Sequence, residues 1–289
     1  MSKFQLFWFG DYLPPYQRLA MKSFVDFGHK YVLYAYKKFD VPAGVELRDA
    51  SDILPESRLF FYGARADVGR GSVAGFSNLF RYHLLYRKGN WWVDADVVCL
   101  SATAPAADIF MGWEYEHLIG NAILKFPDQH EFVRKLRDSA EDAGVDLAWG
   151  ATGPNLLTRL AKEHDLLNFV CPQPLGYPVQ SMDALHILIP TRCDEVRERI
   201  DGKPFLHMWN EIFRRAVIFP WMAPPPDSLV AQLFRRHGID FGDAPIYTAD
   251  QIQRLNDNYY AAAVWSHEFA EKAEAERRKA RLTRAQNPN

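Results

Sequence analysis

The sequence predicts an α/β fold in which helices pack against a sheet of short strands. Over the first 200 residues, short apolar segments rich in aromatic and β-branched residues alternate with longer segments of helical character, as strands and helices do in this class. Glycines and prolines stand at the boundaries of these segments. The chain has 289 residues, of which 48% are hydrophobic, so it is long enough to bury a substantial core.

The first elements are predicted as strand, helix and strand. KFQLFWFG, residues 3–10, is apolar and aromatic and ends in glycine, which favours a first strand. PPYQRLAMKSFVDFG, residues 14–28, has prolines at its start and a glycine at its end, as a helix commonly does. HKYVLYAY, residues 29–36, is a second β-rich segment. We expect residues 40–75 to be mostly loops, with a short strand near 45–47.

Further elements follow in the same alternating order. HLIGNAILKF (117–126) is predicted as a strand and HEFVRKLRDSAEDAG (130–144) as a helix with a polar face. TGPNLLTRLAKEHD (152–165) is predicted as a helix with Pro154 at an early position, where a missing N–H costs nothing. PWMAPPPDS (220–228) is expected to be a loop.

The C-terminal part has a different composition. We expect one α/β domain over 1–250, followed over 251–289 by a helical extension and a flexible basic tail. From about Tyr260 the chain is predicted to be an exposed helix. This segment carries a basic cluster that comprises Arg277, Arg278, Lys279, Arg281 and Arg284. A charge cluster of this kind usually forms a solvated helix face, and contact with anionic lipid is the alternative.

Composition narrows the class of protein. A formal net charge of -2 argues against a dedicated nucleic-acid binder. Cys99, Cys171 and Cys193 have no C-x-x-C spacing, so we expect reduced thiols. The sequence shows no secretory signal and no apolar run of the roughly 18 residues that a membrane helix needs. We therefore expect a cytoplasmic protein, with possible peripheral contact at the inner membrane face through the basic tail.

Residues 72–88 are predicted to form a helix with two distinct faces. Ser72 is a candidate N-cap, and Gly89 is expected to end the helix. One face should pack on the sheet and comprises Phe76, Leu79, Phe80 and Leu84, with His83 as a core histidine. A polar group on this helix comprises Ser77, Asn78 and Arg81. Because Arg81 follows the other two by four and three residues, the three side chains should point in the same direction.

WWVDADVVCL, residues 91–100, is predicted to be a buried strand that carries two aspartates. Because side chains alternate along a strand, Asp94 and Asp96 should project to the same side. Two adjacent buried carboxylates are costly unless a positive charge lies between them. Mg²⁺ or Mn²⁺ would supply that charge and take further ligands from substrate phosphates. A D-x-D pair alone is a weak signal, and an exposed acidic turn is the alternative, but the flanking apolar residues argue against such a turn.

A longer pattern strengthens the interpretation. SNLFRYHLLYRKGNWWVDAD, residues 77–96, resembles the sugar-binding region with a DXD motif that typifies glycosyltransferase family 32 and the related clostridial toxin glucosyltransferases. Four other segments resemble elements of that family, so that the similarity covers most of residues 4–215: FQLFWFG, GNAILKFPDQHEF, TGPNLLT and HMWNEIF.

The resemblance implies a GT-A fold, with a Rossmann-like nucleotide-binding sheet flanked by helices. It implies a metal-dependent, retaining transfer of a hexose from a nucleotide sugar, UDP-linked rather than GDP-linked. The acceptor would be a glycan, a lipid-linked carrier in polysaccharide biosynthesis, or a protein. A front-face route, in which the leaving phosphate takes the acceptor's proton, would require no separate base.

The resemblance also implies roles for individual residues. Asp96 would bind Mn²⁺ or Mg²⁺, and Asp94 would lie against the ribose or sugar, or bind the metal through water. His207 would contact the metal or a phosphate, in a segment with Trp209 that closes over the diphosphate. The remaining assignments are to the base and to the sugar: Trp8 would stack on the base, and Ser77, Asn78, Arg81 and Asn121 would lie at the sugar.

Two departures from the family pattern leave alternatives open. Asn78 stands where the family has aspartate, and an amide both donates and accepts hydrogen bonds without carrying charge. Asn90 replaces a glycine, a mild change because asparagine tolerates the same backbone angles. A non-catalytic carbohydrate-binding protein on a degenerate GT-A fold is one alternative. A sugar nucleotidyltransferase is the other, although the N-terminal segment FWFGDYLPP lacks the glycine-rich phosphate loop usual in such enzymes.

Overall fold

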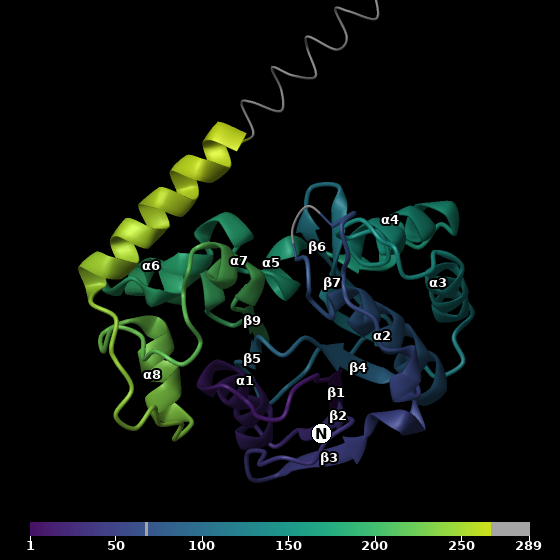
Figure 1. Ribbon diagram of the computed structural model, residues 1–289, viewed down its shortest axis with the longest axis horizontal. Helices are drawn as coiled ribbons and strands as arrows, with labels where there is room; N and C mark the ends of the chain where they lie inside the picture. The colour runs from purple at the N-terminus through teal and green to yellow at the C-terminus, as the bar shows by residue number, and fades with distance from the viewer. Residues whose placement is uncertain (67–68, 267–289) are drawn as a thin grey trace, which may run out of the picture.

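A seven-stranded sheet forms the centre of the protein in the computed structural model, which describes residues 1–66 and 69–266 (Figure 1). In spatial order the strands are β3 (Val45–Asp49), β2 (Lys30–Ala35), β1 (Lys3–Phe7), β4 (Asn90–Val93), β7 (Leu118–Phe126), β6 (Phe110–Tyr115) and β8 (Val170–Cys171). Strands β3, β2, β1 and β4 are parallel, whereas β7 is antiparallel to both β4 and β6. The predicted α/β class is confirmed.

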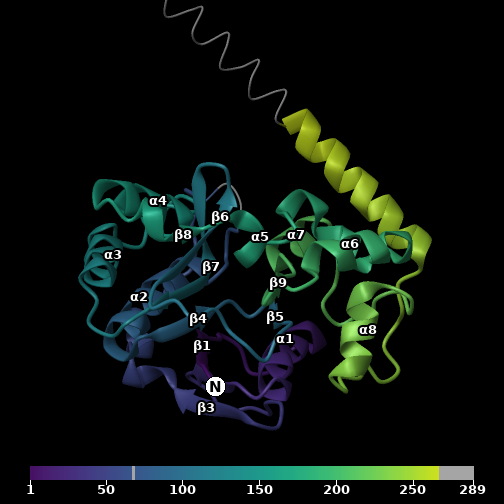
Figure 2. The ribbon, with the colours of Figure 1, turned by 180° about the vertical axis from the view of Figure 1, so that it is seen from behind.

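Each face of the sheet buries its own hydrophobic core. Alternate residues of β4 show the division, because Trp91 belongs to one core and Trp92 to the other. Trp92 shares its core with α2 (Ala74–Lys88), α3 (Glu131–Asp142) and α4 (Pro154–Glu163), which gather on one side of the molecule (Figures 1 and 2). Trp91 shares the other core with α1 (Pro15–Asp26), α6 (Cys193–Ile200), α7 (Asn210–Arg215) and α8 (Leu229–Arg236).

The predicted helix over 72–88 is present as α2 and begins two residues later than expected. Ser72 lies before the helix, and its Oγ accepts a hydrogen bond from the Ala74 N–H at 3.1 Å. Gly89 ends the helix at φ 54°, where a Cβ would lie 2.4 Å from the Asp128 nitrogen. Only glycine fits this turn into β4.

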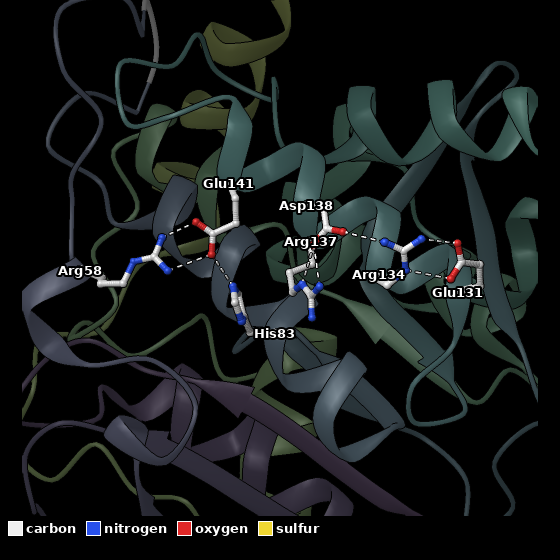
Figure 3. A network of polar contacts seen from close by, with 7 residues as sticks. All are labelled: Arg58, His83, Glu131, Arg134, Arg137, Asp138 and Glu141. Atoms are coloured by element: carbon white, nitrogen blue, oxygen red, sulfur yellow. Dashed lines mark hydrogen bonds and ion pairs between the residues drawn. The ribbon is translucent and has the colours of Figure 1, made fainter.

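Polar contacts connect α3 with α2 and with the short 3-10 helix Glu56–Arg58 that precedes α2 (Figure 3). The carboxylate of Glu141 accepts from Arg58 and lies 2.6 Å from His83 Nε2. His83 is therefore a structural histidine, as expected. The hydrogen bond from Arg58, opposed by partial burial and assisted by His83, lowers the pKa of Glu141 to about 2.

The predicted strand over 91–100 is not continuous, and this prediction was wrong. β4 ends at Val93, the chain turns through Asp94–Ala95–Asp96, and β5 (Val97–Cys99) begins a second sheet. The Val97 N–H donates to the Asp94 carbonyl at 3.1 Å and closes this turn. β5 then pairs with β9 (Phe205–His207), which supplies the hydrogen bonds that the first sheet no longer provides.

The C-terminal described segment is a helix over residues 249–266, which projects from the body of the protein (Figure 1). Ile252 is fully buried and Leu255 packs against the core, so the first turns are anchored. Residues 220–228 form the expected loop. The basic cluster predicted for the tail lies outside the described residues. In residues 1–66 and 69–266, we find no helix that is both long and apolar enough to span a membrane.

Candidate active site

The residues that the sequence analysis assigned to a site all line one cavity of about 700 Å³. It opens at the carboxyl ends of β1 and β4, where open α/β sheets bind ligands. These residues come from five parts of the chain, namely Trp8, then Ser77, Asn78 and Arg81, then Asp94 and Asp96, then Asn121, and finally His207 and Trp209. The fold thus places them together, and their individual roles stay predictions.

Asp94 is held from two sides by residues of α2 and β4. Arg81 Nη2 donates to Asp94 Oδ1 at 2.7 Å, and Trp92 Nε1 donates to the same oxygen at 2.6 Å. The Arg81 guanidinium also lies over the Trp92 ring, 4.7 Å from its centroid. Burial raises the pKa of Asp94, Arg81 partly offsets that effect, and Asp96 adds to it.

Arg81 has donors that no protein group uses. Its side chain is only 3% exposed, yet Nε and Nη1 are buried without a hydrogen-bond partner in the described part of the chain. Buried guanidinium donors are costly to leave unpaired. Arg81 reaches the cavity wall, but these two nitrogens are closed off from solvent, so a ligand or water would contact them only after the surrounding side chains moved.

Asp96 contacts the last residue of β9 and the segment that follows it. Its backbone carbonyl accepts from the Met208 N–H at 2.9 Å, and Oδ2 accepts from the Asn210 N–H at 2.7 Å. Oδ1 lies 3.3 Å from His207 Nε2. Burial opposes ionisation of both groups, but their attraction outweighs it, so that the pKa of Asp96 is lowered and that of His207 is raised.

Trp209 turns the chain from β9 into α7. Its φ of 60° lies in the left-handed region, which is unusual for a bulky side chain. Trp209 Nε1 donates to the Val179 carbonyl at 2.8 Å, and the indole packs against the His207 ring at 4.1 Å between centroids. Such strain persists where the surroundings fix it, and it is common at functional sites.

Two buried asparagines form a further part of the wall. Asn121 on β7 donates from Nδ2 to Asn78 Oδ1 on α2 at 2.9 Å. Gly153, just before α4, lies so close that a Cβ there would be 3.0 Å from both amide nitrogens. Asn78, which the resemblance places at the sugar, is thus paired amide to amide with Asn121.

Trp8 follows β1 directly and is half-buried at the cavity wall. Its Nε1 donates to the Tyr12 carbonyl at 3.0 Å, which fixes the plane of the indole. Phe9, Tyr62 and Trp149 also line the cavity. This aromatic group suits a flat ring such as a nucleotide base.

Sequence reasoning missed Glu114, which also lines the cavity. It lies on β6, a strand that the sequence analysis did not identify. Burial raises the pKa of Glu114 to about 7, His207 opposes this rise, and Asp94 adds to it. The sequence signal that could have found it is FMGWEYEHLIG, in which two strand-like segments flank a short polar turn.

The donor set suits a divalent ion that takes some of its ligands from substrate. Among the described residues, no group of three or more His, Cys, Asp or Glu side chains forms a metal site. Both hydrogen bonds to the Asp94 carboxylate go to Oδ1, and no described residue donates one to Oδ2. Mg²⁺ is commonly bound by one or two carboxylates together with phosphates and water. Arg81 and His207 already offset the two aspartates, however, so burial of the pair does not by itself require a metal.

Comparison with known proteins gives similarity over part of the chain. No family model matches. Lactosylceramide 4-alpha-galactosyltransferase of Pongo pygmaeus is 22% identical over 146 residues, which cover 47% of this chain and 66% of that protein. The protein of the same name from Homo sapiens is also 22% identical, over 47% of this chain and 41% of its own length.

This chain is similar in sequence to glycosyltransferases. The alignment spans less than two thirds of the length of these curated relatives. Among solved structures, a chain named PaToxG Glycosyltransferase aligns with a TM-score of 0.40 and 10% identity, over 90% of this chain and 84% of that one.

Proposed function

We propose that this chain is a glycosyltransferase that moves a hexose from a nucleotide sugar to a hydroxyl group of an acceptor. The observation that carries the proposal is the convergence of four separate segments of the family-like pattern on one cavity. These segments follow β1, run through α2 to the D-A-D turn, include Asn121 on β7, and reach Trp209 after β9. The sequence similarity to galactosyltransferases supports the same activity.

The cavity offers a suitable environment to each part of a nucleotide sugar. Trp8 would stack on the base. Arg81, which lies at the cavity wall beside Asp94, would hold sugar hydroxyls together with Asn78 and Asn121. Asp96 and His207 lie where the end of β9 meets the D-A-D turn, and we assign the diphosphate to this region.

We further propose that Mn²⁺ or Mg²⁺ binds at Asp96 and Asp94, with His207 as an additional ligand or phosphate contact. When bound, such an ion supplies Lewis-acid stabilisation of the negative charge on the departing diphosphate. The protein's own contribution is to orient Asp96 through Asn210 and His207 and to orient Asp94 through Arg81 and Trp92. A retaining outcome and a UDP-linked donor remain part of the proposal.

The names of the curated relatives guide the choice of substrates. They are called lactosylceramide 4-alpha-galactosyltransferases, so UDP-galactose is the first donor to test and a glycolipid or lipid-linked glycan is the first acceptor class. The helix over 249–266 brings Tyr259 to the cavity wall, and we expect it to form part of the acceptor side.

The test is hydrolysis of UDP- and GDP-sugars with Mn²⁺, comparing the wild type with Asp96→Asn and Trp8→Ala. We expect one nucleotide sugar to be cleaved and Asp96→Asn to be inactive. Loss of base stacking should weaken nucleotide binding in Trp8→Ala by about 1–3 kcal/mol. Trp221→Ala, an exposed residue outside the cavity, is the matched control. Tight glycan binding without any nucleotide effect would instead support a carbohydrate-binding protein.

A further inference from the structure

Glu114 occupies the extra position of a β-bulge. In the pairing of β6 with β7, Trp113 lies opposite Ile119 and Tyr115 lies opposite Leu118, so Glu114 has no partner residue of its own. In a regular strand, consecutive side chains point to opposite faces of the sheet. Here both Glu114 and Tyr115 line the cavity. The bulge therefore redirects the strand so that two successive side chains reach one site.

The Glu114 carboxyl group is half-buried without a partner. No described residue forms a hydrogen bond or an ion pair with it, in contrast to Asp94 and Asp96 in the same cavity. Burial without compensation is costly for a carboxylate, which accounts for its raised pKa of about 7. A fold that tolerates this cost at a redirected strand position has a use for the side chain at that place.

The surroundings define what Glu114 could bind. Its charge acts on His207 and Tyr177, and it is itself affected by His207 and Asp94, so it lies toward the D-A-D end of the cavity. Of the two aspartates, it is Asp94, paired with Arg81, that acts on Glu114, so Glu114 lies on the side of the cavity that we assign to the sugar. An ionised carboxylate only accepts hydrogen bonds. A neutral group with several donors, such as the hydroxyl groups of a sugar ring, is complementary to it.

We propose that Glu114 determines sugar specificity by accepting hydrogen bonds from hydroxyl groups of the hexose in the bound nucleotide sugar. This inference rests on the proposed function and adds a residue that the family-like pattern does not include. Arg81 and Glu114 then bind the same sugar with different hydrogen-bonding character, since the guanidinium only donates whereas the carboxylate accepts.

Binding measurements separate the sugar from the nucleotide. Isothermal titration calorimetry with Mn²⁺ would compare UDP with UDP-galactose and GDP with GDP-mannose, for the wild type, Glu114→Gln and Glu114→Ala. Glu116→Gln is the control, because Glu116 lies two residues further along, at the hairpin turn, with a side chain that is 90% exposed. For the nucleotide sugar that binds, we expect Glu114→Ala to raise Kd about 10-fold or more. The Kd of the free diphosphate should change less than twofold.

Thermal unfolding checks that the variants fold. Because the pKa of Glu114 is raised in the folded protein, its ionisation disfavours folding as pH rises toward 7 and above. Glu114→Gln should therefore be at least as stable as the wild type at pH 8, so a loss of sugar affinity in that variant cannot be ascribed to unfolding.

Three results would overturn the inference. An equal loss of affinity for UDP and UDP-galactose would mean that Glu114 acts on the nucleotide or on the site as a whole. Nucleotide-sugar affinities matching those of Glu116→Gln would mean that Glu114 does not contact the sugar, while the proposed function stands if the wild type binds and cleaves a donor. Failure of the wild type to bind any of the four nucleotides would overturn the proposed function and this inference together.

Discussion

Asp96→Asn tests the coupling between the D-A-D turn and the segment after β9. The substitution keeps an oxygen that can accept from the Asn210 N–H, and it leaves the backbone bond from Met208 intact. What it removes is the charge that faces His207 at 3.3 Å. One contact to a charged group is lost, so we expect a destabilisation of about 1.5–3 kcal/mol. That corresponds to a fall in Tm of roughly 3–12 °C for a domain of this size.

The cost of Asp96→Asn should depend on pH. The folded-state pKa of His207 is raised, so its stabilising contribution is fully present below the unfolded pKa of about 6.5. It is lost as pH rises through the higher folded value. The lowered pKa of Asp96 keeps its carboxylate ionised across this range. In the variant, burial of His207 is no longer offset by Asp96, so His207 should become neutral more readily. The destabilisation should therefore be larger at pH 6 than at pH 9.

Urea denaturation at pH 6 and pH 9, with EDTA to remove metal ions, measures this difference. Asp108→Asn is the matched control, because Asp108 is exposed and lies outside the cavity. A destabilisation by Asp96→Asn that is equal at both pH values would refute the ion pair with His207 as its cause. A variant as stable as the wild type at pH 6 would refute the coupling itself.

Two further predictions concern packing and surface charge. Gly120→Ala would place a Cβ 2.3 Å from the Tyr177 hydroxyl oxygen, and we expect the free energy of unfolding to fall by about 1–3 kcal/mol; since that hydroxyl is buried without a partner among the described residues, Tyr177→Phe should recover part of the lost stability, and no recovery would locate the strain elsewhere. Arg58→Gln should raise the pKa of Glu141 above its value of about 2, as followed by NMR titration, and should flatten the fall in stability on acidification from pH 5 to 2. Because Arg58 is 41% exposed, the cost at pH 7 should stay below about 1 kcal/mol, and an unchanged Glu141 pKa would contradict the assignment.

Local sequence patterns predicted well those helices and strands that short-range signals define. The strand over 3–7, the helix that ends at Gly89 and the helix that begins at Pro154 are each defined by short-range signals, namely apolar runs, a positive-φ glycine and an early proline. Residues that share a helix face, such as Asn78 and Arg81, also reach the cavity together because helical spacing alone fixes their direction.

The features that the sequence did not predict depend on contacts between distant segments. Nothing local to WWVDADVVCL shows that Val97 pairs with His207. The sequence therefore predicts one continuous strand where the structure has a break around Ala95. The bulge at Glu114 depends on the register between β6 and β7, and pairing register is not written in either strand alone. The left-handed backbone of Trp209 is likewise imposed by its neighbours, since tryptophan itself disfavours it.

The same long-range contacts determine how much of the chain the candidate site needs. The D-A-D turn receives hydrogen bonds from Met208 and Asn210, and Cys99 pairs with Phe205 in the second sheet. The central sheet alone would leave Asp96 without His207 and without these donors. Strain at Trp209 of the kind that costs about 1–3 kcal/mol is offset by its bond to Val179 and by packing on His207. The first 200 residues thus contain the strand that ends at the site, but the geometry of Asp96 is completed only by the segment over 205–210.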